Sequence, residues 1–201
     1  MTIPILITRI RLTLIASKSQ HFLDNNRALS TDTYFYRIKR ILLISDTHSY
    51  FGEEIEKHLK DVDEVWHAGD WGDPTVSAEL EENSLVRGVY GNIDTLEIRR
   101  KYPKELIYTV EGLTVYMIHI GGYPGRYEAG VRDALVKHKP DLFICGHSHI
   151  CKVMKDKNLD LVHFNPGAIG KHGFHTKRTM MKFNIDNGKL FDINILEYER
   201  N

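Results

Sequence analysis

From Lys39 onward the chain alternates short β-rich runs with segments of helical spacing, and this alternation is the feature that most limits its fold. The β-rich runs are "RILLISD", "VDEVWHAGD" and "SLVRGVYGN", and the helical segments between them are "GEEIEKHLK" and "PTVSAELEEN". The proline that opens the second helical segment suits a first helical turn. Strands that alternate with helices predict βαβ units and a largely parallel sheet in this half.

The second half is richer in strands. "ELIYTVEGLTVYMIHI" predicts two strands joined by a tight turn at Glu111-Gly112, "GRYEAGVRDALVKHK" predicts a helix, and "PDLFICG" predicts a strand. From Cys151 on, four more strands are expected over "CKVMKD", "DLVHF", "TMMKFNID" and "LFDINILEY", with turns at Asp156-Lys157 and Asn187-Gly188. The whole pattern predicts a mixed α/β sandwich of two sheets with helices outside.

We expect one domain over residues 39–201, preceded by an N-terminal extension over residues 1–38. Within the extension, "ILITRIRLTLIA" alternates apolar residues with Arg and Thr, the period of a half-buried strand. Arg9 and Arg11 interrupt the uncharged block that a signal peptide keeps. An added edge strand and a disordered tail both remain open for this segment.

Composition excludes several classes of protein. The 27 basic and 27 acidic residues cancel, so we expect no stable binding to nucleic acid. No stretch reaches the roughly 18 consecutive apolar residues of a membrane span. Two cysteines are too few for a secreted disulfide framework and indicate a reducing compartment, so we expect a cytoplasmic protein. A homo-oligomer is compatible with the sequence.

Polar side chains follow five of the predicted strands at the point where each ends. Ligands bind at the carboxyl ends of strands in open α/β sheets, where loops carry function on a rigid base. Each motif alone has an ordinary explanation, since Gly-Asp and Gly-Asn are turn dipeptides and a lone histidine often packs in a core. The occurrence of all five in sequence, each after a strand, argues against chance. The candidate metal ligands are Asp46, His48, Asp70, Asn92, His119, His147 and His149.

In this order, Asp-x-His, Gly-Asp, Gly-Asn-x-Asp, an isolated His and Gly-His-x-His resemble the motifs of the calcineurin-like metallophosphoesterase superfamily. The short chain and "HFNPGAIG" are similar to its compact prokaryotic phosphodiesterase branch. The resemblance covers Lys39 to the end. It implies a four-layer αββα sandwich, two mixed sheets flanked by helices, with a dinuclear metal centre at the strand ends.

The resemblance also assigns the ligands and the reaction. Asp46, His48 and His149 go to one metal ion, Asn92, His119 and His147 to the other, and Asp70 bridges the two. Imidazoles with hard oxygen ligands suit manganese, which we expect, or nickel, zinc, iron and magnesium as alternatives. The implied activity is phosphodiester hydrolysis of a small substrate by a hydroxide held between two divalent ions.

One departure from the family bears on catalysis. Many members carry a histidine in Gly-Asn-His-Asp, which protonates the leaving group, and this chain has Ile93 there. Isoleucine donates no proton, so rapid turnover should favour leaving groups of low pKa. Asp94 is retained as a candidate catalytic residue, and a turn-capping role is the alternative. A second departure, Ala168 in place of serine, is expected to matter little.

Two further residues are candidates for substrate contact. Arg126 belongs to "GGYPGRYE", which is expected to form part of the pocket rim. His172 lies in a basic cluster with Lys171, His175 and Arg178, which either meets phosphate or is a solvated loop. His67 either supports the neighbouring ligand or packs in its strand, and Cys145 is interpreted as a buried hydrophobe.

Two other functions remain alternatives. The same centre could hydrolyse phosphomonoesters or dinucleoside polyphosphates, since selectivity depends on the pocket walls. A non-catalytic scaffold is the second, because a eukaryotic retromer subunit resembles this fold with a degraded metal centre. Every ligand position is occupied in this chain, which favours the enzyme.

Overall fold

Two β-sheets face each other in the computed structural model, which describes residues 7–9 and 38–200. The larger sheet has the strand order β1-β13-β12-β2-β3-β4, and the smaller has the order β10-β11-β9-β6-β5. The larger sheet contains β1 (Ile7–Arg9), β13 (Lys189–Glu199), β12 (Lys177–Asp186), β2 (Lys39–Ile44), β3 (Glu64–His67) and β4 (Leu85–Gly88). The smaller sheet contains β10 (Cys151–Asp156), β11 (Leu161–Pro166), β9 (Leu142–Ile144), β6 (Leu113–Ile118) and β5 (Glu105–Val110).

The strand directions follow the two halves of the sequence. β2, β3 and β4 run parallel and are joined by α1 (Glu53–Leu59) and α2 (Pro74–Asn83), as the alternation predicts. The hairpins β5–β6, β10–β11 and β12–β13 are antiparallel. The turn at Glu111 and Gly112 has φ of 44° and 77°, so both residues are left-handed, as a two-residue hairpin turn requires.

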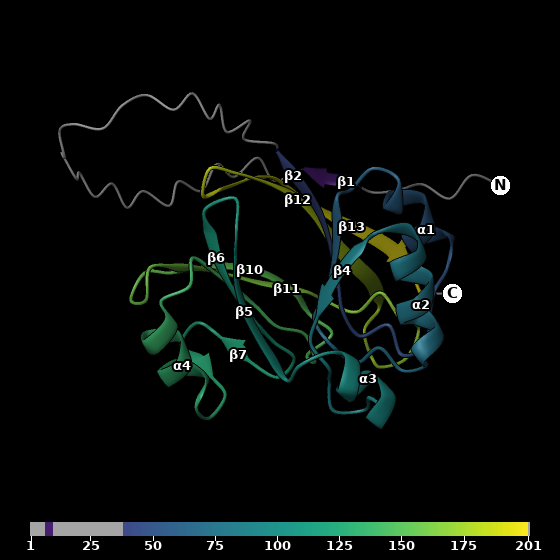
Figure 1. The fold of residues 1–201 in the computed structure, drawn as a ribbon, viewed down its shortest axis with the longest axis horizontal. Coiled ribbons are helices and arrows are strands. Elements are labelled where there is room, and N and C mark those ends of the chain that lie inside the picture. The colour runs from purple at the N-terminus through teal and green to yellow at the C-terminus, as the bar shows by residue number, and fades with distance from the viewer. Residues whose placement is uncertain (1–6, 10–37, 201) are drawn as a thin grey trace, which may run out of the picture.

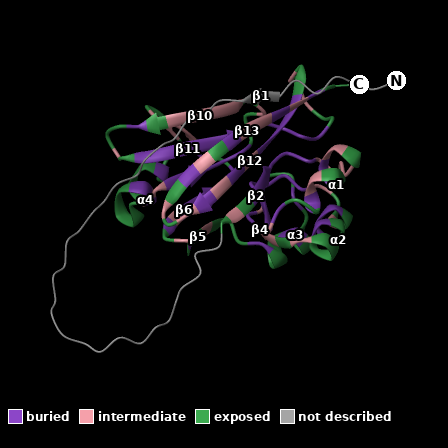
Figure 2. Cartoon of the chain, turned by 90° about the horizontal axis from the view of Figure 1, so that it is seen from above, coloured by how far each residue is buried: buried purple, intermediate pink, exposed green. Residues whose placement is uncertain are grey.

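Alternate residues of each strand face different layers. Ile41 and Leu43 of β2 pack between the sheets against the apolar side chains of the smaller sheet, while Leu42 and Ile44 pack under the helices. Helices α1, α2 and α3 (Leu96–Lys101) cover the larger sheet, and α4 (Val131–His138) covers the smaller one (Figure 1). Burial follows the same layers, with buried strands between helices that are exposed on their outer faces (Figure 2). The predicted αββα sandwich is confirmed.

One local prediction was wrong, and one helix was not predicted. The helix expected over residues 125–139 begins only at Val131, because Gly125 and Gly130 adopt φ of 88° and 79°, outside the helical region. The residues before it form a short ribbon of β7 (Gly122–Tyr123) and β8 (Arg126–Tyr127) instead. Helix α3 was not predicted; its cap is Thr95, whose hydroxyl accepts from the Ile98 amide.

The N-terminal strand β1 pairs antiparallel with β13 at the edge of the larger sheet. This is the edge-strand alternative for Ile7–Arg9, and the rest of the extension over residues 1–38 lies outside the described residues. Within the described residues, no helix has the length and apolar character needed to cross a membrane.

Candidate metal centre

The loops that follow five strands meet at one end of the sandwich. In the larger sheet, β2, β3 and β4 are parallel neighbours, with Ile44 opposite His67 and His67 opposite Gly88 at their carboxyl ends. In the smaller sheet, β6 and β9 run parallel in the same way. All seven predicted ligands follow these five strand ends. The fold therefore explains why residues separated by about a hundred positions meet.

Six of the seven predicted ligands form two compact groups. The ligand atoms of Asp46, His48 and His149 lie within 4.8 Å of one another, and so do those of Asp70, His119 and His147. The seventh, Asn92, lines a pocket of about 520 Å³, the metal-ligand pocket, together with His48, Asp70, His147 and His149. The convergence expected from the sequence is present. The first group is the ligand set that the resemblance implies for one ion, and the second holds His119 and His147 of the other set with Asp70, the implied bridge, in place of Asn92.

His119 presents an unpaired ring nitrogen to the carboxylates. Its Nδ1 lies 2.7 Å from the carbonyl oxygen of Ala68, so Nδ1 carries the proton and donates it there. The Nε2 atom then faces Asp70 Oδ1 at 3.2 Å and Asp46 Oδ1 at 4.0 Å. Both Nε2 and Asp46 Oδ1 are buried without a hydrogen-bond partner among the described residues. Lone pairs that face one another in this way fit a cation between them.

A second imidazole is oriented through a relay. His175 Nε2 lies 3.1 Å from the Gly170 carbonyl and must donate to it, so His175 Nδ1 is an acceptor. His149 Nδ1, 3.2 Å away, donates to that acceptor. His149 Nε2 is thereby left unprotonated, 3.3 Å from Asp46 Oδ1 and 3.3 Å from His48 Nε2. Such an outer partner fixes the tautomer that a metal ligand needs.

The carboxylates and imidazoles shift one another's pKa. Burial opposes the imidazolium form of His119, but Asp70 and Asp46 outweigh it and raise the pKa of His119. Burial also opposes the charge of Asp70, but the neighbouring His119 and a hydrogen bond from the Ile93 amide lower the pKa of Asp70 nevertheless. Burial lowers the pKa of His48, which favours a neutral ring with a lone pair. The two carboxylates thus favour a positive charge beside them, which a bound cation would supply.

The backbone is strained at five of the seven predicted ligands. Non-glycine residues rarely adopt positive φ, and strain of this kind concentrates at functional sites, where it costs on the order of 1–3 kcal/mol per residue. The five ligands in the left-handed region are Asp46 (53°), His48 (45°), Asp70 (58°), His147 (68°) and His149 (56°). The fold holds these loops in tight turns that point the side chains inward.

Two glycines let neighbouring loops approach the ligands. A Cβ atom on Gly91 would lie 2.0 Å from Asp70 Oδ1, and one on Gly146 would lie 2.0 Å from Ser45 Oγ and 2.9 Å from Asp46 Oδ2. Each distance is far inside van der Waals contact. Glycine at these positions therefore keeps the ligand side chains free of crowding.

Asp94 holds the loops together. Its carboxylate is 5% exposed and accepts three backbone amides, from Asp70 at 3.1 Å, Gly72 at 2.9 Å and Gly91 at 2.7 Å. Burial raises the pKa of Asp94, and these hydrogen bonds oppose the shift. The contacts are those of a residue that positions the metal-binding loops, since both carboxylate oxygens are directed at amides.

The two predicted substrate contacts lie on different sides of His147. His172 lines the pocket of the metal-ligand groups, and its ring centroid is 5.0 Å from that of His48. Arg126 lines a neighbouring pocket instead. Ile93 is 46% exposed and lines the metal-ligand pocket through its side chain, while its amide donates to Asp70 Oδ1 at 3.1 Å.

Two supporting histidines were only partly anticipated. His175 was placed in a basic cluster, and its role as the partner of His149 depends on a loop that returns 26 residues later. His67 was predicted either to pack in its strand or to support the neighbouring ligand. Its ring packs by stacking on Trp71 with centroids 3.7 Å apart, and it also contacts Thr47 Oγ1 in the ligand loop after β2 at 2.9 Å. Adjacency to the Asp70 motif was the signal for His67, and the sequence holds no comparable signal for His175.

Comparison with known proteins identifies the family of the chain. The family model of the calcineurin-like phosphoesterase superfamily domain matches residues 40–188. A probable metallophosphoesterase of Methanothermobacter thermautotrophicus is 31% identical over 135 aligned positions, and the match covers 63% of this chain and 74% of the relative.

Solved structures share the fold. A predicted phosphoesterase of Streptococcus pneumoniae is 20% identical with a TM-score of 0.58, and the match covers 82% of this chain and 91% of that one. Vps29 of Entamoeba histolytica, solved in complex with Zn²⁺, is 14% identical with a TM-score of 0.62, covering 81% of this chain and 99% of that one. At these identities the likeness shows the fold alone.

Proposed function

The chain belongs to the calcineurin-like phosphoesterase superfamily, and we propose that it is a metal-dependent phosphodiesterase with a dinuclear centre. The observation that carries the proposal is the convergence of the two ligand groups around unpaired lone pairs of His119 and Asp46. The proposed ligands are Asp46, His48, Asp70, Asn92, His119, His147 and His149. Manganese is the proposed metal, since neutral imidazoles and hard oxygens make up the donor set.

Bound divalent cations would supply Lewis-acid chemistry, polarising a phosphoryl oxygen and lowering the pKa of water to about 7. The protein's residues supply the placement. Ala68 and His175 fix the tautomers of His119 and His149, so that Nε2 of each ring is free to coordinate. Asp70 belongs to the group of His119 and also faces the other group. Its Oδ1 lies 3.2 Å from His119 Nε2 and its Oδ2 lies 3.9 Å from His48 Nε2, so one carboxylate could bridge two ions.

The charge of the pocket favours a diester over a monoester. A phosphomonoester dianion carries one more negative charge than a diester at neutral pH. Among the described residues that line the pocket of the metal ligands, none is lysine or arginine. The extra charge of a monoester would therefore have no side-chain cation to meet it in this pocket, and a diester would not need one.

The rim of the pocket suits an ester arm with apolar surface. Ile93, Ile150 and Phe174 line it and are 46%, 59% and 102% exposed. Exposed apolar side chains at the mouth of a polar pocket typically contact the non-reacting part of a substrate. Isoleucine at position 93 donates no proton where many family members carry a histidine, so we propose that good leaving groups are hydrolysed fastest.

A matched panel of esters tests the proposal. Bis(p-nitrophenyl) phosphate and p-nitrophenyl phosphate share the leaving group and differ in the second ester arm, and each is assayed with Mn²⁺, Ni²⁺, Zn²⁺ and Mg²⁺. We expect the diester to have the larger kcat/KM, and Asp70→Asn to abolish turnover without loss of the fold. Full activity in Asp70→Asn at saturating metal would overturn the metal mechanism, and a preference for the monoester would overturn the substrate class.

The alternative functions have less support. Monoesters and dinucleoside polyphosphates would use the same ligands, and the panel separates them. The scaffold alternative is considered because the chain shares its fold with Vps29. Every ligand position of this chain carries a residue that can bind a metal, and this favours catalysis. A protein that takes up no metal at saturating Mn²⁺ would favour the scaffold.

A further inference from the structure

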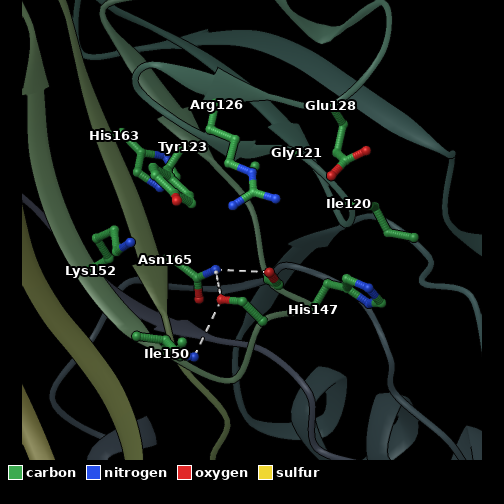
Figure 3. A pocket seen from close by; sticks show the side chains of 13 residues that line it. Ile120, Gly121, Tyr123, Arg126, Glu128, His147, Ile150, Lys152, His163 and Asn165 are labelled. Atoms are coloured by element: carbon green, nitrogen blue, oxygen red, sulfur yellow. Dashed lines mark hydrogen bonds between the residues drawn. The ribbon is translucent and has the colours of Figure 1, made fainter.

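A second pocket, of about 250 Å³, lies beside the metal-ligand pocket. Its floor is the outer face of the smaller sheet, where Lys152 of β10 pairs with Asn165 of β11 and His163 lies two residues before Asn165 on the same face. Its roof is the β7–β8 ribbon, which contributes Tyr123 and Arg126 (Figure 3). We call it the ribbon pocket.

The ribbon pocket is continuous with the site of the proposed reaction. His147, Ser148 and Ile150 line both pockets, so one loop separates the metal ligands from the ribbon pocket. Asn165 holds this loop: its amide donates to the Gly146 carbonyl at 2.8 Å and to Ser148 Oγ at 3.1 Å (Figure 3). A substrate with its reacting phosphate among the metal ligands could extend an arm past His147 into the ribbon pocket.

The ribbon pocket offers the cations that the metal-ligand pocket lacks. Neither Lys152 nor Arg126 forms an ion pair among the described residues, and Lys152 Nζ lies 3.8 Å from the ring centroid of Tyr123. One carboxylate, that of Glu128, also lines the pocket. With both histidines neutral, the lining carries a net side-chain charge of one positive unit, which favours an anion.

His163 provides a second, independent indication of a ligand. The side chain is 1% exposed, lines the ribbon pocket, and has no hydrogen-bond partner for either ring nitrogen among the described residues. Buried polar groups are nearly always paired, because an unpaired one loses its hydration without compensation. Burial and the charge of Lys152 lower the pKa of His163 to about 4, so near neutral pH the ring offers one donor and one acceptor.

We propose that the ribbon pocket binds a second phosphate group, carried on one ester arm of the substrate, with Lys152 and Arg126 as its charge partners. This rests on the proposed function and narrows it to phosphodiesters that bear a further phosphate. His163 contacts the arm that connects the two phosphates or an oxygen of the second phosphate. Glu128 opposes the anion and limits how tightly it is held.

A pair of probes that differ only in the second phosphate tests the proposal. Thymidine 3′,5′-bisphosphate and thymidine 5′-monophosphate are titrated calorimetrically at a fixed excess of Mn²⁺. We expect the bisphosphate to bind about tenfold more tightly, as for one charge-assisted contact. Equal affinity for the two probes would overturn the proposal.

Four variants identify the pocket as the source of the preference. Lys152→Met and Arg126→Gln should each reduce the preference for the bisphosphate to about twofold, whereas Glu128→Gln should increase it. Lys155→Met is the matched control, since Lys155 lies on the same strand with its side chain on the other face and outside the pocket lining, and it should leave the preference unchanged. Arg126 lies on an exposed ribbon, so its variant remains informative if Lys152→Met folds poorly. An unchanged preference in both cation variants would contradict the assignment.

Hydrolysis separates this proposal from the proposed function. The p-nitrophenyl ester of thymidine 5′-phosphate and its 3′-phosphorylated form are assayed in parallel with the titrations. Binding preference without turnover of either ester would retain the ribbon pocket and reject the phosphodiesterase. Turnover of both with equal KM and no binding preference would retain the phosphodiesterase and reject the second-phosphate site.

Discussion

Replacing Asp94 with asparagine removes one charge and one acceptor from a buried carboxylate that accepts three amides and joins the loops after β3 and β4. In its better orientation, the asparagine oxygen keeps the amides of Asp70 and Gly91, and its NH₂ group then faces the Gly72 amide, which is 2.9 Å from the present oxygen. A buried donor left unpaired costs about 1–3 kcal/mol, and the two hydrogen bonds that remain lose their charge assistance.

A gain opposes this loss. Burial raises the pKa of Asp94, so the neutral side chain avoids part of the desolvation penalty of the carboxylate. We therefore expect Asp94→Asn to lower the free energy of unfolding by about 2 kcal/mol, which corresponds to a decrease in Tm of about 4–8 °C in a domain of this size. Thermal and urea unfolding in the presence of a chelator would measure the loss without a contribution from metal.

Asp73→Asn is the matched control. Asp73 caps α2 by accepting the Thr75 amide at 2.9 Å in an exposed position, and asparagine caps a helix as well as aspartate does. Its free energy of unfolding should stay within about 0.5 kcal/mol of the wild type. If Asp94→Asn were equally neutral, the assignment of Asp94 as the residue that joins the loops would be refuted.

Three further variants or conditions test other contacts. His175→Phe removes the acceptor of His149 Nδ1 and should weaken metal binding at one site by about 10–100-fold, whereas His138→Phe on α4 should not. Metal titration measures both variants, and equal effects would show that His175 does not orient His149. Ile93→His supplies a proton donor and should speed hydrolysis of esters with poor leaving groups by about a hundredfold, seen as a flatter dependence of kcat on leaving-group pKa; an unchanged slope would exclude that position from acid catalysis. The pKa of His163 is lowered to about 4 in the fold from 6.5, so the unfolded chain binds more protons between these values and stability falls as pH drops through that window. His163→Phe should flatten this pH dependence in urea unfolding, and an unaltered slope would show that another group causes it.

The strand ends explain why so much of the site could be predicted from the sequence. Helix α2 begins and ends where expected because Pro74 and its cap Asp73 mark its start. The ligands could be found because parallel strands bring their carboxyl ends to one edge of the sheet. A short motif after each strand therefore predicts contact between residues that are distant in the sequence. Gly125 and Gly130 both disfavour a helix before Val131, but the helix was predicted there from the apolar periodicity alone.

The contacts that were not predicted are made between loops that are far apart in the sequence. Nothing near His175 indicates that its ring meets His149, and nothing near Lys152 indicates a shared pocket with Arg126. Asp94 was left between a catalytic role and a turn-capping role, and its three amide contacts become evident only when the loops after β3 and β4 are seen together. Such contacts are set by tertiary packing and have no local pattern.

Equilibrium dialysis against Mn²⁺, with the bound metal counted per chain, tests the central claim most directly. Two groups of ligands predict that the wild type binds two ions at saturation and that His149→Ala, which removes a ligand from only one group, retains one. A wild type that binds no Mn²⁺, or a single ion that His149→Ala leaves in place, would contradict the account.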